Sequence, residues 1–261
     1  MKTLLVGECK PEHVFFLSDP DAPSEAQFEL DVAKALACLY PNHRCISFTG
    51  SFRHGDRVFR PDLALVAKDY SHWFVIEVEL LTHSLHNHVL PQVRAFKSGE
   101  PQPDCVTQLA VRLGIGCGEA QSLLHLVPKE VAVVANKSDY GWERTLKGSG
   151  VQMIVVSVYK SAQDAVAVEI EGDLEAAVES LGFGQYSATD RSLRFRKDIR
   201  LPAGTVQLFD PAGGLSSWNV VQGPDAVWVT KAVGVPNLPH NAHIQVMKTI
   251  EGRLSLRRPT L

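Results

Sequence analysis

Three carboxylates lie in two consecutive apolar segments of the chain, at spacings that suit cation binding. Asp62 ends an Arg-Pro-Asp step and opens the apolar run LALVA, while Glu77 and Glu79 lie two residues apart within WFVIEVEL. Side chains two apart in a strand point to the same face, so Glu77 and Glu79 are expected side by side. If the two runs pair as a hairpin across the polar turn between them, Asp62 lies near the C-terminal end of the second strand. The three carboxylates then converge.

Apolar neighbours make a cation the expected partner of these carboxylates. Like charges this close cannot all stay ionised in an apolar setting unless a cation lies between them. Hard divalent ions such as Mg²⁺ take few protein ligands, usually carboxylates, and complete their coordination with water and substrate phosphate. The alternative is an acidic edge strand whose carboxylates are solvated. The valine, isoleucine and leucine residues around Glu77 and Glu79 favour a buried, central strand instead.

A helix and a strand are predicted before these two segments. Ser24 caps a helix over residues 24–40, where apolar residues recur at helical spacing. Glu25 and Glu29, four residues apart, lie on one side of this helix. The segment RCISFTGSF then predicts a strand that leads through a bend into the LALVA run.

Further strands and helices follow the acidic strand. Residues 82–98 predict a helix in which Pro91 marks a kink or a fresh start. Two short helices separated by GIGCG, the strand EVAVVAN, a helix from Tyr140 and the strand VQMIVVSVY come next, and AVAVEIE is a further candidate strand. This alternation predicts a mixed α/β core.

The order of these elements resembles the PD-(D/E)xK nuclease superfamily. The shared pattern is a helix with a glutamate, a strand, a strand that opens on Pro-Asp, a strand with an acidic tripeptide and a further helix, over residues 24–97. The resemblance implies a restriction-endonuclease-like domain, a mixed sheet flanked by helices. It also implies that Asp62 and Glu77 bind a metal ion, with the backbone carbonyl of Val78 as a third ligand.

One position departs from the family pattern, because Glu79 stands where the motif has lysine. A carboxylate there would act as general base, orient the attacking water or recruit a further metal ion. The loss of the lysine leaves open a catalytically inactive relative. Two other positions, Glu29 and Gln92, also fit the resemblance. Glu29 matches an acidic residue on the first helix of some members. Gln92, followed four residues later by Phe96, is similar to the Gln-x-x-x-Tyr feature of helicase-associated relatives.

The activity implied by the resemblance is Mg²⁺- or Mn²⁺-dependent endonuclease action on DNA, with RNA left open as a substrate. Its implied settings are restriction, repair or anti-phage defence, in a homodimer or a larger assembly. Arg53, Arg57 and Arg60 precede Asp62 and could hold flanking phosphates, although each could equally be a solvated strand end. The alternative function is a nuclease-fold protein without catalysis that binds nucleic acid or protein. A third is a structural or toxin–antitoxin partner whose C-terminal domain does the recognition.

The pattern of predicted elements changes after residue 185, from alternating strands and helices to short strands alone. This change predicts two domains. Residues 1–185 form the nuclease-like α/β domain, and residues 190–261 form a small, mostly antiparallel β-barrel or sandwich of short strands separated by glycine and proline turns. Residues 190–261 hold ten Lys/Arg against five Asp/Glu, a balance of about +5, and the rest carries 16 against 24. One interpretation of a basic β domain in an otherwise acidic chain is that it binds a polyanion. The alternative is that its arginines are scattered over the surface and have no function.

Composition excludes several other classes. The chain has no apolar run of the ~18 residues that a membrane span needs, and the opening MKTLLVGECK is too short in its apolar part for an export signal. The five cysteines, Cys9 among them, show no CxxC pair, which fits a reducing cytoplasm. His83, His86 and His88 invite a zinc interpretation, but their spacing does not place all three on one helical face. We therefore expect a polar helix start, from which one imidazole could approach a metal-bound water.

Two short motifs resemble nucleotide-binding sequences, and we interpret both as local structure. NKSD (136–139) copies a guanine-reading motif, but no phosphate-binding loop accompanies it, so Ser138 or Asp139 is expected to cap a helix. GIGCG follows a helix rather than a strand, so a dinucleotide site is not expected there.

Overall fold

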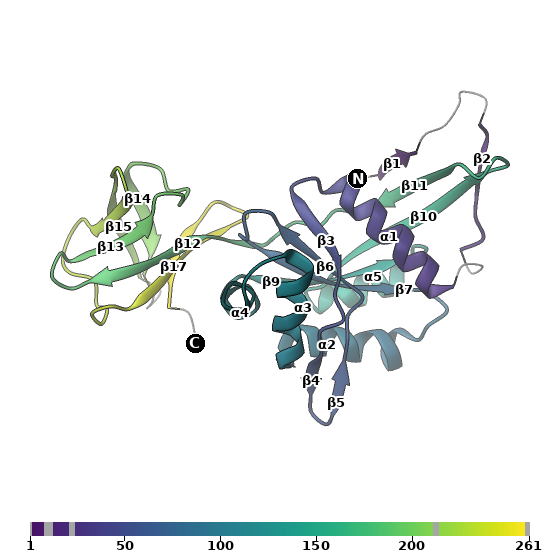
Figure 1. The fold of residues 1–261 in the computed structure, drawn as a ribbon, viewed down its shortest axis with the longest axis horizontal. Helices are drawn as coiled ribbons and strands as arrows, with labels where there is room; N and C mark the ends of the chain where they lie inside the picture. Colours follow the sequence, from purple (N-terminus) through teal and green to yellow (C-terminus); the bar gives the residue numbers. More distant parts are fainter. Residues whose placement is uncertain (1, 8–12, 21–23, 211–213, 259–261) are drawn as a thin grey trace. The chain divides into compact units, whose positions relative to one another are not determined.

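The computed structural model describes residues 2–7, 13–20, 24–210 and 214–258, in two compact units. Unit 1 comprises 1–68, 73–124 and 129–175; unit 2 comprises 69–72, 125–128 and 176–261. Within the described residues, no helix is both long enough and apolar enough to span a membrane. Each unit has its own sheet system, and the chain is a mixed α/β protein (Figure 1).

The elements of the first 175 residues are, in chain order, β1 (Lys2–Val6), β2 (Phe15–Leu17), α1 (Glu25–Leu39), β3 (His43–Ser47), β4 (Phe52–His54), β5 (Arg57–Phe59), β6 (Leu63–Ala67), β7 (Trp73–Glu79), a π-helix (Leu85–Val89), α2 (Leu90–Ser98), β8 (Glu100–Pro101), α3 (Pro103–Leu113), α4 (Cys117–Leu126), β9 (Lys129–Ala135), α5 (Tyr140–Gly148), β10 (Gln152–Ser161) and β11 (Val166–Glu171). The main sheet has the order β1-β11-β10-β9-β7-β6-β3, with β2 paired to β10.

The β6–β7 hairpin predicted from the sequence is present. The strands are antiparallel, with Leu63 opposite Ile76 and Val66 opposite Trp73. Strand β7 also pairs in parallel with β9, so it lies inside the sheet and every one of its residues is buried. Burial on both faces explains why this strand is nearly continuously apolar apart from its two glutamates. In this register Asp62, just before β6, comes opposite Glu77.

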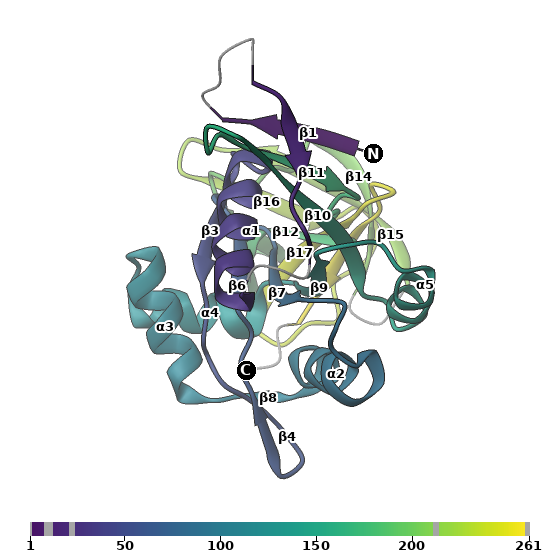
Figure 2. The same cartoon turned by 90° about the vertical axis from the view of Figure 1, so that its right-hand side faces the viewer.

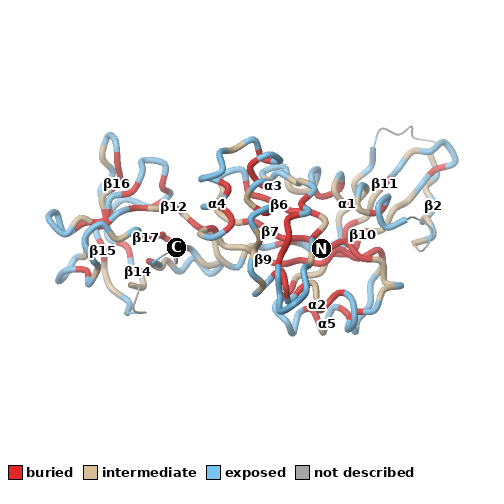
Figure 3. The backbone as a smooth tube through the Cα atoms, turned by 60° about the horizontal axis from the view of Figure 1, so that its bottom comes forward, coloured by how far each residue is buried: buried red, intermediate tan, exposed pale blue. Residues whose placement is uncertain are grey.

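Helices cover both sides of the main sheet. The α1 helix starts at the Ser24 cap, whose side chain accepts a hydrogen bond from the Gln27 amide, and buries Phe28 and Val32. Figure 2 shows α1 on one side of the strands and α2 and α5 on the other, and Figure 3 shows the buried strands between them. Pro91 is the second residue of α2, which continues the preceding π-helix with Val89 and Leu90 in helical conformation, so the proline lies where π-helical hydrogen bonding gives way to α-helical bonding.

One predicted strand is divided in the structure. RCISFTGSF forms β3 in the main sheet and then β4, which pairs with β5 and β8 in a separate three-stranded sheet. The turn between them is tightly packed: a Cβ on Gly50 would lie 2.8 Å from the Phe48 ring and 2.9 Å from the Cα of Cys105. The Ser51 hydroxyl donates to the Asp104 carboxylate at 2.7 Å, which holds the chain at this bend.

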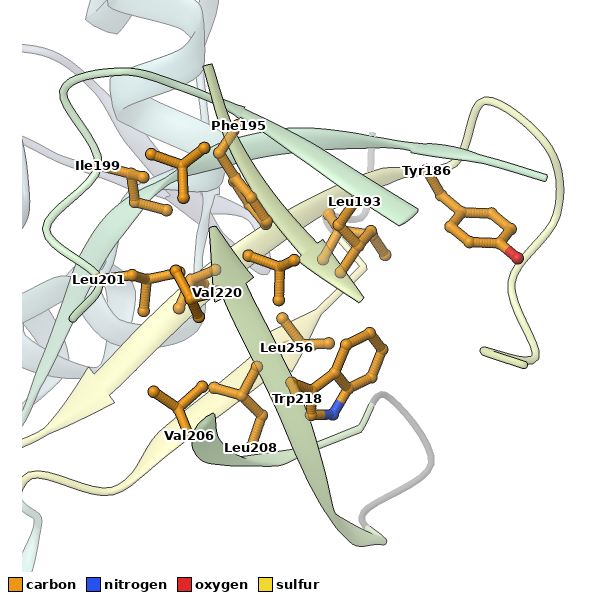
Figure 4. Packing of buried hydrophobic residues seen from close by; sticks show 14 residues of the cluster. Tyr186, Leu193, Phe195, Ile199, Leu201, Val206, Leu208, Trp218, Val220 and Leu256 are labelled. Carbon is orange, nitrogen blue, oxygen red and sulfur yellow. The ribbon is translucent and has the colours of Figure 1, made fainter. Parts of the chain in front are cut away.

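Unit 2 contains a closed β-barrel. Its strands are β12 (Val178–Ser187), β13 (Ser192–Arg196), β14 (Gly204–Phe209), β15 (Leu215–Gln222), β16 (Ala226–Lys231), β17 (His243–Thr249) and β18 (Leu254–Arg257), closed in the order β12-β13-β16-β15-β14-β18-β17. All pairs are antiparallel except β14 with β18. Apolar side chains from all seven strands or their connections, including Trp218, Phe195 and Leu208, fill the interior (Figure 4).

The barrel begins earlier in the chain than the boundary expected at 185–190. Strand β12 pairs with both β13 and β17, so the barrel cannot close without residues 178–187. This strand has a weak sequence signal because glycines interrupt it. One of them is required by packing: a Cβ on Gly184 would lie 2.5 Å from the Phe195 ring. Strands β1 and β2 were likewise not expected, since MKTLLV was interpreted only as a short apolar run.

Candidate metal centre

Asp62 and Glu77 meet at the point where β6 begins. The Val78 amide donates a 2.7 Å hydrogen bond to Oδ2 of Asp62, which fixes this carboxylate beside β7. The contact uses one of the two oxygens of Asp62, so Oδ1 can bind a ligand. The resemblance assigned the Val78 carbonyl as a metal ligand; the structure shows the Val78 amide orienting another expected ligand, and the carbonyl role stays a prediction.

Glu77 is a buried carboxylate with one unsatisfied oxygen. Its side chain is 3% exposed. The Gln92 side-chain amide, from the first turn of α2, donates to Oε1, whereas Oε2 is buried without a hydrogen-bond partner. Phe96, one turn beyond Gln92, packs against Phe52 in the core and does not share this contact. A buried oxygen without a partner is costly, and a bound cation would satisfy it.

The protonation of this pair reflects burial and crowding. Burial raises the pKa of Asp62 to about 7, with the Val78 amide acting against the rise and Glu29, Glu25 and Glu79 adding to it. Burial also raises the pKa of Glu77 well above its ordinary value, and repulsion from Asp62 and Glu79 adds to this. Both carboxylates therefore hold protons more tightly than free carboxyl groups. A bound divalent cation would offset the burial and the repulsion and would stabilise their ionised forms.

The first helix adds two acids near this pair. Glu29 is half-buried, and its pKa is raised by burial and by repulsion from Glu25. Glu25 itself contributes repulsion at Asp62, Glu77 and Glu79. Of these two acids, only Glu29 was expected at the metal site, although the four-residue spacing of the two glutamates was a signal that includes Glu25.

Glu79 has two histidine partners, which the sequence analysis did not predict. Its side chain is completely buried, and Oε2 lies 2.6 Å from Nδ1 of His83. Nε2 of His88 lies 3.3 Å from Oε1, and the two imidazole rings are 4.9 Å apart between centroids. One ligand atom from each of the three residues lies within 4.8 Å of the others. Burial raises the pKa of Glu79, and His83 acts against this rise.

An unusual turn brings these histidines together. The chain leaves β7 through a turn closed by the His83 amide and the Leu80 carbonyl, which returns His83 to Glu79. The Ser84 side chain then caps a π-helix in which Val89 donates to Ser84 across five residues. His88 lies within this π-helix and His83 lies just before its Ser84 cap, so the turn and the helix together bring both rings to Glu79. His86 is exposed and takes no part. The expectation of a merely polar helix start is therefore incomplete.

Asn136 anchors the same loop from the neighbouring strand. Its side-chain oxygen accepts from the Leu81 amide at 2.9 Å, and its nitrogen donates to the Pro20 carbonyl at 2.7 Å. Asn136 is the first residue of the NKSD segment, whose Asp139 caps α5 by accepting from the Trp142 amide, as the sequence predicted. This segment therefore has structural contacts that need no nucleotide.

The lysine missing from the motif is not supplied by the adjacent strand β9. Val133 and Ala135 lie opposite Glu77 and Glu79 in the β7–β9 register. Lys129, at the start of β9, is opposite Trp73 at the other end of β7 and lies over the Phe52 ring at 4.6 Å. Burial lowers the pKa of Lys129 to about 8.

The three candidate phosphate-binding arginines are exposed on or next to the β4–β5 hairpin. The Arg53 guanidinium donates to the Gln102 side chain at 2.8 Å, and the Arg57 guanidinium lies 4.7 Å from the centre of the Phe59 ring. Arg60 directly precedes the Pro61–Asp62 step. The hairpin projects from the rest of unit 1 (Figure 1). These contacts leave the arginines accessible to a ligand, and their binding of phosphate stays a prediction.

The remaining sequence motifs have structural roles. Gly114 ends α3 in the left-handed conformation at φ 67°, so the GIGCG segment is a helix cap followed by α4. Cys38, Cys45, Cys105 and Cys117 are free thiols; Cys9 lies outside the described residues.

Unit 2 carries a hollow on the outside of its barrel. An open groove of about 540 Å³ runs across β12, β13, β16 and β17. One row of directly paired residues crosses it: His243, Gln185, Arg194 and Trp228. The Arg194 guanidinium lies 5.3 Å from the centre of the Trp228 ring. Asp190 and Asp225 also line the groove, so its charge is mixed.

Comparisons of the chain with protein-family models, with curated proteins and with solved structures gave no match.

Proposed function

We propose that this protein is a metal-dependent nuclease that hydrolyses phosphodiester bonds in nucleic acid, with a restriction-endonuclease-like unit 1. Asp62 and Glu77 would hold Mg²⁺ or Mn²⁺, together with the Val78 carbonyl. The observation that carries the proposal is the buried Glu77 carboxylate, with Oε2 unsatisfied and Asp62 beside it. DNA is the proposed substrate class, in keeping with the resemblance of residues 24–97 to the nuclease superfamily.

The surrounding residues support this chemistry. A divalent ion at the pair would polarise the scissile phosphate and a bound water, and would offset the repulsion between the carboxylates. Gln92 holds one oxygen of Glu77, so Oε2 would be presented in a fixed direction. Glu25 and Glu29 would add negative charge near the pair, which favours cations. Glu79 is the candidate base, although its contact with His83 means that the imidazole would share any proton it accepts.

Asp62→Asn tests the proposal. We expect wild-type protein to cut supercoiled plasmid or single-stranded nucleic acid in Mg²⁺ or Mn²⁺, and the variant to lose this cutting by ~10²–10³-fold, as when one charge-stabilising group leaves an active site. Asp56→Asn is the matched control, because Asp56 is exposed in the β4–β5 turn. Equal cutting by wild type and Asp62→Asn would overturn the assignment of this site.

The groove on the barrel favours a second candidate function, a nucleic-acid binding module. Single strands bind to proteins that combine aromatic faces for the bases with positive charge for the backbone. Trp228 and Arg194 provide both within one row of the sheet, and the sequence around the barrel is basic overall. This function would persist even if unit 1 had no catalytic activity.

Substitutions in the groove separate the two candidates. Trp228→Ala and Arg194→Ala should each weaken binding of a labelled oligothymidylate or oligouridylate by ~10-fold, since stacking on one aromatic is worth ~1–3 kcal/mol per base. Fluorescence anisotropy at two salt concentrations measures this. Arg253→Ala, which removes a charge outside the groove lining, is the control. Unchanged affinity in both groove variants would exclude the groove as a strand-binding surface.

A further inference from the structure

Glu79, His83 and His88 together have the composition of a transition-metal site. We propose that they bind a first-row dication of the Zn²⁺ class, at a site distinct from the Asp62–Glu77 pair. The proposal does not depend on phosphodiester hydrolysis, and a Glu79 that binds this metal ion would not also serve as the base. It rests on three ligand atoms within 4.8 Å of one another, two of them imidazole nitrogens.

The donor set selects the kind of metal. Imidazole nitrogen suits Zn²⁺, Fe²⁺, Ni²⁺ and Cu²⁺, whereas Mg²⁺ prefers oxygen ligands and retains water. Two histidines and one glutamate form a known three-ligand set for zinc, which leaves a fourth position for water or substrate. The Asp62–Glu77 pair offers only oxygens. The two neighbouring sites therefore differ in the cation they would prefer.

One of the distances between ligand atoms matches that around a bound ion. Ligand atoms around a tetrahedral Zn²⁺ are ~3.3 Å apart when each bond is ~2.0–2.1 Å long. Nε2 of His88 and Oε1 of Glu79 already lie 3.3 Å apart. Nδ1 of His83 is closer to Oε2, at 2.6 Å, because these atoms share a hydrogen bond. Metal binding would replace this bond and separate the two atoms slightly.

The burial of Glu79 between two imidazoles favours a metal site over a simple hydrogen-bonded contact. Glu79 is completely buried, and a carboxylate in that setting is ionised only if it has a positive partner. One imidazole would suffice to hydrogen-bond it, yet a second ring approaches its other oxygen. The histidine side chains are 32% and 49% exposed, so an ion could reach the carboxylate past their rings.

The backbone prepares this arrangement. The turn after β7, the Ser84 cap and the π-helix fix the positions of both rings, and Asn136 holds the Leu81 amide between Glu79 and His83. A π-helical turn is uncommon in proteins and is often found at functional sites. Positions fixed before binding reduce the entropy that binding must overcome.

The test is Zn²⁺ binding by the full-length protein in saturating Mg²⁺, measured by calorimetry and by the visible absorption of Co²⁺ as a substitute. We expect one ion per chain. His83→Ala and His88→Ala should each weaken Zn²⁺ binding by at least ~100-fold, the upper end of the losses seen even for supporting residues. His86→Ala is the matched control, because His86 is an exposed histidine of the same turn.

Two further measurements complete the test. In the wild-type protein, Zn²⁺ should shift the imidazole NMR signals of His83 and His88 and leave that of His86 unchanged, so the result does not depend on folding of the variants. Asp62→Asn should abolish hydrolysis and retain Zn²⁺ binding, which separates this site from the proposed nuclease centre. Equal Zn²⁺ affinity in all three histidine variants, or equal NMR shifts of all three rings, would overturn the proposal.

Discussion

Glu77→Gln is expected to abolish hydrolysis and, at the same time, to stabilise the metal-free protein at alkaline pH. Glutamine keeps the size of the side chain and can still accept from Gln92, but it cannot ionise. The activity should fall by ~10²–10³-fold because a charged metal ligand is lost. Stability should rise because the substitution removes a buried acid that Asp62 and Glu79 repel.

The stability gain should depend on pH and on metal. Below the unfolded pKa of about 4.5, Glu77 is neutral in both the folded and the unfolded state, so the substitution changes little there. As the pH rises, ionisation of Glu77 costs the wild type stability that the glutamine variant retains. Thermal melting in EDTA at acidic and alkaline pH measures the difference, with exposed Glu143→Gln as the control. A lower melting temperature for Glu77→Gln at alkaline pH would show that the ionised carboxylate is well compensated without metal.

The metal-free protein should lose stability as the pH rises from about 4 to about 8. The pKa of Asp62 is about 7 in the folded protein against 3.8 for the free side chain, so the folded state binds the proton more tightly. The stabilisation from this proton is complete below the unfolded pKa and disappears as the pH rises through the folded one. A difference of about 3 pH units corresponds to about 4 kcal/mol.

Urea unfolding in EDTA across this pH range measures the effect, and Asp62→Asn should flatten the curve by about the same 4 kcal/mol. Added Mg²⁺ or Mn²⁺ at pH 8 should restore stability to the wild type, because the ion binds the deprotonated carboxylates. Stability of the wild type that is constant or rises between pH 4 and pH 8 in EDTA would contradict this electrostatic account.

Local patterns were enough to predict the scaffold of the candidate site. The two-residue period of a strand places Glu77 and Glu79 on one face, and the short polar turn before Trp73 suits the hairpin with LALVA that the structure contains. The Ser24 cap and the proline at the start of α2 are equally local signals. Each depends on neighbours in the chain, which is why it can be read without knowledge of distant contacts.

The partners of the carboxylates depend on long-range packing instead. His83 and His88 meet Glu79 because a turn and a π-helix follow β7, and this wider hydrogen bonding has no clear signature in the residue pattern. Closure of the barrel required β12, whose glycines weaken its strand signal but make room for Phe195. Gly50 similarly separates β3 from β4 through a contact with Cys105, more than fifty residues away. The sequence thus specifies which residues can do chemistry and on which strands they lie. Contacts between distant segments determine which atoms those residues face, because burial and hydrogen bonding there are set by the folded chain as a whole.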